Sequence, residues 1–206
     1  DRRQRQMCIR DRTMVVVEDL YRPYRPKRRT RAMIAKEKGL EPLAALITLQ
    51  KAEKPIDVYA EEYVNPEKEV KSVKEAIDGA KDIIAESVSD EADYRSWIRK
   101  ATVQHGKVIS QAKDEKAESV YEMYYDFEEP VTKLAGHRVL ALNRGEKEKF
   151  LTVKIEAPQD DILRYLEKKM IHSDNPHTTP ILKEVAEDSY KRLIAPAIAV
   201  SYTHLT

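Results

Sequence analysis

The segment around residues 72–88 constrains the fold most, because it carries the clearest helix signal in the chain. Ser72 and Glu75 form a Ser-x-x-Glu capping box, which supplies partners for the free N–H groups at a helix start. The apolar residues that then recur at helical spacing are Val73, Ala76, Ile77, Ala80, Ile83, Ile84 and Val88. A second helix is expected from about Asp90 to Gly106, and we expect the two helices to form an antiparallel pair.

Shorter helices are expected on both sides, wherever a capping residue or a proline punctuates an amphipathic stretch. They are predicted at residues 30–38, from Pro42, from Pro55, and at 117–127, 136–149, 158–172 and from Thr179 onward. Thr30 suits a helix start, and Gly39 suits the left-handed residue after a helix end. These patterns predict a mainly helical chain.

Two segments alternate apolar and polar residues in the manner of strands, Lys107–Ala112 and Phe150–Glu156. We expect them to pair as one antiparallel ribbon with helices on one face, because two strands alone are marginal in water. The predicted fold is therefore mainly α, an irregular multi-helix array with one small two-stranded β ribbon. No repeat period is evident, which argues against a solenoid.

Residues 21–32, the basic connector, crowd cations onto a segment that prolines keep out of helical geometry. Its candidate nucleic-acid-binding residues are Tyr21, Arg22, Tyr24, Arg25, Lys27, Arg28, Arg29 and Arg31. The arginines suit phosphate contacts without base specificity, and the tyrosines among them suit single-stranded nucleic acid. The alternative is an acidic protein surface.

Three blocks of the sequence also carry a family resemblance: residues 18–44, 117–146 and 179–196. They resemble the N-terminal region of the bacterial Tex family, transcription accessory proteins that bind nucleic acid. The resemblance implies a longer parent protein with RNase H-like, helix-hairpin-helix and OB-type RNA-binding domains after this region. RNA or DNA would then be bound mainly through those domains, and the transcription machinery is a further expected partner.

The two ends, residues 1–12 and 199–206, resemble translated sequencing-adapter sequence, which leaves 13–198 as a Tex-like region truncated at both ends. Residues 1–12 hold five basic and two acidic side chains and 199–206 hold none, so without them the formal net charge falls from +1 to −2. The body is then mildly acidic with one basic stretch. The only cysteine, Cys8, lies in the adapter-like part, which excludes a disulfide framework and suits a reducing cytoplasm. No apolar run approaches membrane-spanning length.

Two further clusters have a functional and a structural interpretation. One cluster could bind phosphate or act in catalysis; it consists of His137, Arg138 and Arg144 beside Gly145. We favour a structural role for it, in which these side chains join helices through ion pairs with Glu128, Glu129 or Glu146. Tyr121, Tyr124 and Tyr125 could stack on bases, but their spacing favours core packing.

No pattern in the sequence predicts a catalytic residue, a metal site or a cofactor. His105, His172 and His177 lack the spacing of metal ligands, and nucleotide-binding and hydrolase motifs are absent. Together with the Tex resemblance, this leads us to expect a non-catalytic scaffold that holds and orients the nucleic-acid-binding domains that the resemblance implies. The alternatives are a protein-docking module and a nuclease-like hydrolase fragment.

Overall fold

The computed structural model describes residues 19–24, 28–114 and 116–198 of the 206-residue chain. The adapter-like ends lie outside these described residues, as do Arg25 and Lys27 of the basic connector. The described residues divide into two compact units: those up to Ser96 with Leu163–Ala197, and those of Trp97–Ile162 with Ile198. No helix among the described residues is both long and apolar enough to cross a bilayer.

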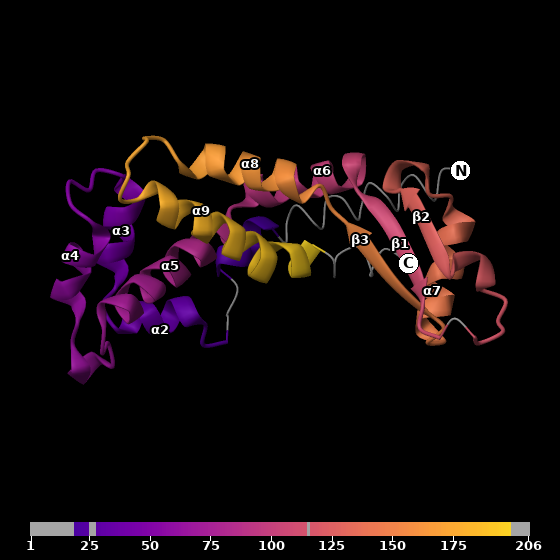
Figure 1. Ribbon diagram of the computed structural model, residues 1–206, viewed down its shortest axis with the longest axis horizontal. Coiled ribbons are helices and arrows are strands. Elements are labelled where there is room, and N and C mark those ends of the chain that lie inside the picture. The colour runs from indigo at the N-terminus through magenta and orange to yellow at the C-terminus, as the bar shows by residue number, and fades with distance from the viewer. Residues whose placement is uncertain (1–18, 25–27, 115, 199–206) are drawn as a thin grey trace. The chain divides into compact units, whose positions relative to one another are not determined.

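The first unit is built from helices (Figure 1). They are α2 (Arg31–Glu37), α3 (Glu41–Leu49), α4 (Ile56–Ala60), α5 (Val73–Asp90) and α9 (Thr179–Asp188); α6 (Ala92–His105) begins in this unit and α8 (Gln159–Met170) ends in it. Short turns are η1 (Arg22–Tyr24), η2 (Glu61–Tyr63), η3 (Pro66–Lys68) and the π-helical η6 (Ser189–Ile194). The mainly helical prediction is confirmed.

The predicted capping residues make the expected hydrogen bonds. Thr30 Oγ1 accepts from the Met33 N–H at 3.1 Å, and Ser72 Oγ accepts from the Glu75 N–H at 3.2 Å. The Glu75 carboxylate accepts in turn from the Lys71 N–H at 2.8 Å, one residue earlier than a capping box requires. Gly39 has a φ of +82°, the left-handed conformation that ends a helix without a steric penalty.

Helix α5 is the centre of the first unit and packs against α2, α3, α4, α9 and η6. The predicted antiparallel pairing of α5 with the helix that follows it stays a prediction. Small residues on α5 explain its many neighbours, because Ala76, Ala80 and Ala85 are buried and let other helices approach closely. The large buried side chains supplied by the surrounding elements are Leu40, Leu43, Ile47, Ile56, Leu166, Leu182 and Ile194.

A buried glutamine, the Gln50 clasp, joins the end of α3 to the chain after α8. Gln50 is 4% exposed and has a left-handed backbone, with a φ of 56°. Its Nε2 donates to the Met170 carbonyl at 2.6 Å, while its Oε1 accepts from the His172 N–H at 2.9 Å and the Ser173 N–H at 3.0 Å. The side chain thereby satisfies three backbone groups far away in the sequence.

The second unit contains a three-stranded antiparallel sheet: β1 (Lys107–Ala112), β2 (Asp126–Pro130) and β3 (Leu151–Glu156), in the order β2-β1-β3. In its register, Ile109 faces Glu128 on one side and Lys154 on the other. The two predicted strands and their antiparallel pairing are confirmed. The predicted two-stranded ribbon is wrong in number, because β2 adds a third strand beside β1.

Strand β2 replaces the end of the helix that we expected over residues 117–127. The tyrosines that suggested that helix lie instead on the turn η4 (Glu122–Tyr124) and just before it. In a 3₁₀ turn, residues i and i+3 lie on the same side, so Tyr121 and Tyr124 still point together. Strand β2 itself has one large apolar residue, Phe127, and therefore lacks the alternation that reveals a half-buried strand.

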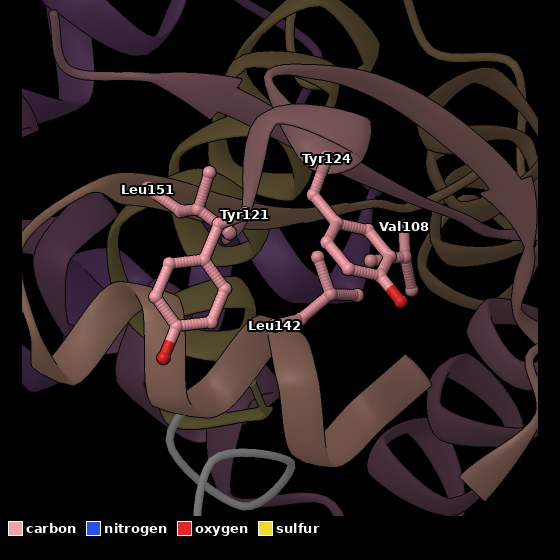
Figure 2. Packing of buried hydrophobic residues seen from close by; sticks show 5 residues of the cluster. All are labelled: Val108, Tyr121, Tyr124, Leu142 and Leu151. Atoms are coloured by element: carbon pink, nitrogen blue, oxygen red, sulfur yellow. The ribbon is translucent and has the colours of Figure 1, made fainter. Parts of the chain in front are cut away.

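The core of the second unit lies on one face of the sheet (Figure 2) and consists of Val108, Tyr121, Tyr124, Leu142 and Leu151. Helix α7 (Gly136–Lys147) supplies Leu142 and packs against β3. The side chains that alternate onto the opposite face are mostly exposed and polar: Lys107, Gln111, Asp126, Glu128, Lys154 and Glu156. Core packing, the favoured interpretation of Tyr121 and Tyr124, is confirmed.

Both outer strands of the sheet carry groups that hinder further pairing. On β3, the Val153 N–H donates to the Glu146 carboxylate at 3.3 Å. Strand β2 ends in Pro130, which has no N–H, and exposes Asp126 and Glu128. Prolines, charges and side-chain covers are the usual means by which proteins protect sheet edges.

Gly145→Ala is expected to lower the free energy of unfolding by about 1–3 kcal/mol, because it overpacks a filled core. A Cβ on Gly145 would lie 2.6 Å from Leu151 Cδ1 and 3.2 Å from Tyr121 Cδ1. Urea denaturation measures the effect. Gly136→Ala is the matched control: no atom lies within 4 Å of its added Cβ, and its stability should stay equal or rise. Equal stabilities of the two variants would contradict the packing role of Gly145.

Candidate nucleic-acid interface

The basic connector begins at a buried ion pair. Arg95 on α6 donates from Nε to Asp19 Oδ1 at 2.8 Å, and the two side chains are only 4% and 7% exposed. A paired charge in a low-dielectric site is held firmly, because separating it leaves the other charge buried and uncompensated. The start of the connector is thus fixed to the first unit.

Arg22, a predicted phosphate ligand, makes a second attachment of the same kind. Its Nε donates to Asp90 Oδ1 at 3.2 Å, and the side chains are 32% and 17% exposed. Asp90 is the last residue of α5. The arginine is therefore already engaged with a carboxylate of its own chain, and it contributes to anchoring the connector.

The large apolar side chains between and just after these attachments face the solvent. Tyr21 is 57% exposed and Tyr24 is 79% exposed, and Leu20 beside them is 60% exposed. Buried aromatic rings usually supply core packing, so exposed neighbouring rings are available for contacts outside the chain. Both tyrosines thus lie where the predicted stacking on unpaired bases requires them.

The remaining described cations of the connector differ in their availability. Arg28 is exposed and makes no ion pair with the described residues. Arg29 pairs with Glu37 at 2.7 Å, but both side chains are largely exposed, so water competes strongly for this pair. Of the connector cations that the structure describes, Arg28 and Arg29 are consequently the ones that a phosphate can reach most easily.

Arg31 faces an acidic helix. It lines an open groove of about 240 Å³ between α2 and α5, with Glu75, Asp78 and Asp82 along the α5 side. Burial raises the pKa of Asp82, and the positive charges of Arg192 and Arg31 act in the opposite direction. Arg192 also contacts this carboxylate directly at 2.8 Å. This acidic surrounding comes from residues far from Arg31 in the sequence, and it makes Arg31 a poor phosphate ligand.

The cluster around α7 in the second unit is partly structural. Arg138 pairs with Glu129 at 2.6 Å and lies 5.8 Å from the centre of the Phe127 ring, which confirms the ion-pair interpretation for this residue. Arg144 is exposed and makes no ion pair with the described residues, so the interpretation is wrong for Arg144. Gly145 serves helix–sheet packing.

The other polar groups that drew attention in the sequence have structural neighbours. Burial raises the pKa of Tyr121, whose hydroxyl also donates to the Glu148 carboxylate at 2.9 Å. His177 belongs to the loop that precedes α9, where its N–H donates to Asn175. In the described part of the chain, no three His, Cys, Asp or Glu residues come together as a metal site would require.

Comparisons with known proteins agree with the resemblance seen in the sequence. A family model described as "Tex central region-like" matches residues 50–195. The chain is 52% identical to "Uncharacterized protein YdcI" of Bacillus subtilis over 185 residues, 88% of this chain and 26% of that protein. It is 33% identical to "Transcriptional accessory protein Tex" of Neisseria gonorrhoeae over 193 residues, 91% and 22% of the two chains.

A human relative is more distant. "S1 RNA-binding domain-containing protein 1" is 27% identical over 203 residues, 91% of this chain and 20% of that protein. The chain thus spans about a quarter, or less, of the length of these relatives.

Proposed function

Since the chain belongs to the Tex family, we propose that it is a non-catalytic helical scaffold of a nucleic-acid-binding transcription accessory protein. In this role it holds and orients nucleic-acid-binding domains of the longer parent protein. The basic connector adds contacts of its own to RNA or DNA phosphates. We expect the parent protein to bind RNA, because one relative is named for an S1 RNA-binding domain.

The observation that carries the connector's role is its combination of anchoring and exposure. Asp19 and Arg22 tie the segment to Arg95 and Asp90. Between and after these attachments, the tyrosines and Arg28 remain open to solvent. The described residues 19–24 are held in place before binding, and a pre-ordered segment loses less conformational entropy on binding than a free one.

The test measures binding of the chain to a fluorescein-labelled oligouridylate of about 20 nucleotides at several salt concentrations. Each phosphate contact to a single strand contributes about 0.7 to the slope of log affinity against log salt. Arg28→Glu with Arg29→Glu should therefore reduce this slope by about 1.4 and lower the affinity at low salt by at least about tenfold. Fluorescence anisotropy reports both quantities.

Lys51→Glu with Lys54→Glu is the matched control, because it changes the net charge equally at exposed positions of the same unit. The proposal expects a much smaller effect from this pair. If the chain shows no salt-sensitive binding at low ionic strength, or if both pairs weaken it equally, the connector is not the phosphate contact.

A second candidate function is protein docking through the connector. It is favoured by the ion pair between Arg22 and Asp90, because the connector already uses an arginine to hold an acidic residue. In that case Arg28→Glu with Arg29→Glu weakens association with the remaining domains of the parent protein and leaves oligonucleotide binding unchanged. Co-purification with those domains separates the two functions.

A further inference from the structure

The outward face of α7 carries a line of polar and cationic side chains around one leucine. His137, Leu140, Arg144 and Lys147 are separated by three, four and three residues, which places them within about 80° of one another on a helix of about 100° per residue. All four are exposed, and Leu140 is 66% exposed. The opposite face of the helix, with Leu142 and Gly145, is buried.

The cations on this face have no carboxylate partner among the described residues. Arg144 and Lys147 make no ion pair there, whereas Arg138 on the flank of the helix pairs with Glu129. The two acids nearest in sequence are engaged elsewhere: Glu146 accepts from the Val153 N–H, and Glu148 accepts from the Tyr121 hydroxyl. Neither acid forms an ion pair with Arg144 or Lys147.

We propose that this face, the α7 stripe, is a second contact for nucleic acid that binds phosphates without reading bases. Arginine and lysine are the usual donors to phosphate oxygens. The stripe extends about 15 Å from His137 to Lys147 at a rise of about 1.5 Å per residue, which is long enough to reach several phosphates. It carries no exposed aromatic ring for stacking and no exposed amide for pairing with base edges.

An acidic protein surface fits the stripe less well than a phosphate backbone does. Lysine is depleted at protein interfaces, and the centre of such an interface is usually apolar and free of charge. The stripe has a single apolar residue, Leu140, with Arg144 and Lys147 beside it. If a protein were the partner, Leu140 would be the anchor of the contact.

The experiment is independent of the basic connector, because Arg28 and Arg29 stay unchanged. Arg144→Glu with Lys147→Glu is compared with the unaltered chain for binding of labelled oligouridylate of about 20 nucleotides. Loss of two phosphate contacts should reduce the slope of log affinity against log salt by about 1.4, at a contribution of about 0.7 per contact. The affinity at low salt should fall by at least about tenfold.

Two further variants make the result decisive. Lys113→Glu with Lys154→Glu makes the same charge change at two exposed positions, one directly after β1 and one on β3. This pair should leave the slope of log affinity against log salt unchanged within error. Leu140→Ala should leave the slope of log affinity against log salt unchanged, because leucine makes no contact with a phosphate charge. The proposal is overturned if the stripe pair has no effect, if the Lys113 and Lys154 pair has the same effect, or if Leu140→Ala alone abolishes binding. Circular dichroism verifies that each variant keeps its helix content.

When the stripe pair and the Arg28 and Arg29 pair are measured side by side, failure of one proposal can be distinguished from failure of the other. An effect of the stripe pair alone would overturn the connector's role and support the α7 stripe. An effect of the connector pair alone would do the reverse.

Discussion

Asp19→Ala is expected to lower the free energy of unfolding of the chain by about 3–5 kcal/mol, the usual cost of removing one partner from a buried ion pair. The reason is that Arg95 is 3% exposed, so the loss of the Asp19 carboxylate takes an opposite charge from a buried guanidinium. Water cannot replace that partner without opening the packing around it. Urea denaturation followed by far-ultraviolet circular dichroism measures the change as a lower midpoint.

Two comparisons separate an uncompensated charge from a simple loss of contacts. Asp19→Leu with Arg95→Met removes both charges and should recover much of the stability, because apolar replacement of a buried pair is often neutral. Glu37→Ala breaks the exposed pair with Arg29 and should change stability by less than about 0.5 kcal/mol. If Asp19→Ala and Glu37→Ala unfold at the same urea concentration, the buried pair does not anchor the connector.

Gln50→Ala is expected to destabilise the chain by about 3 kcal/mol, at about 1 kcal/mol for each of the three backbone groups that the Gln50 clasp satisfies. Removing the amide leaves the Met170 carbonyl and the N–H groups of His172 and Ser173 without their side-chain partner. Native-state hydrogen exchange should show faster exchange at His172 and Ser173, and urea denaturation gives the overall loss.

Gln50→Gly tests the backbone contribution at the same position. Both variants lose the amide, but glycine adopts the left-handed conformation at φ 56° without the penalty of about 1 kcal/mol that other residues carry. The glycine variant should therefore be more stable than the alanine variant by about that amount. Lys51→Ala at the exposed neighbouring position is the control, and a loss equal to that of Gln50→Ala there would contradict the clasp.

The helices could be predicted from the sequence where the signal is local. Ser72, Thr30 and Gly39 act within one turn of the residues they cap, so their effect is visible in a short window. Strand β2 could not be predicted, because its position comes from pairing with β1 rather than from its own pattern. The partners of α5 were likewise set by packing over long separations in sequence.

The candidate nucleic-acid interface could likewise be predicted from the sequence only in part. The cations and tyrosines of the basic connector were evident from the sequence, and the structure adds that Tyr21 and Tyr24 are exposed. The ion pair between Arg22 and Asp90 joins residues 68 positions apart, so no pattern in the sequence near either residue predicts it. A spacing analysis of α7 would have found its outward stripe, but whether an acid neutralises Arg144 depends on side-chain directions that only the folded unit fixes.

The protected edges of the sheet have a consequence for handling this protein in concentrated solution. Glu146 covers a β3 amide, and Pro130 with two exposed acids closes the β2 side. These groups interrupt the row of free donors and acceptors through which sheet edges template fibrils or swapped dimers. Oligomers seen with oligonucleotides would therefore reflect bridging by the ligand, because strand exchange between copies is disfavoured.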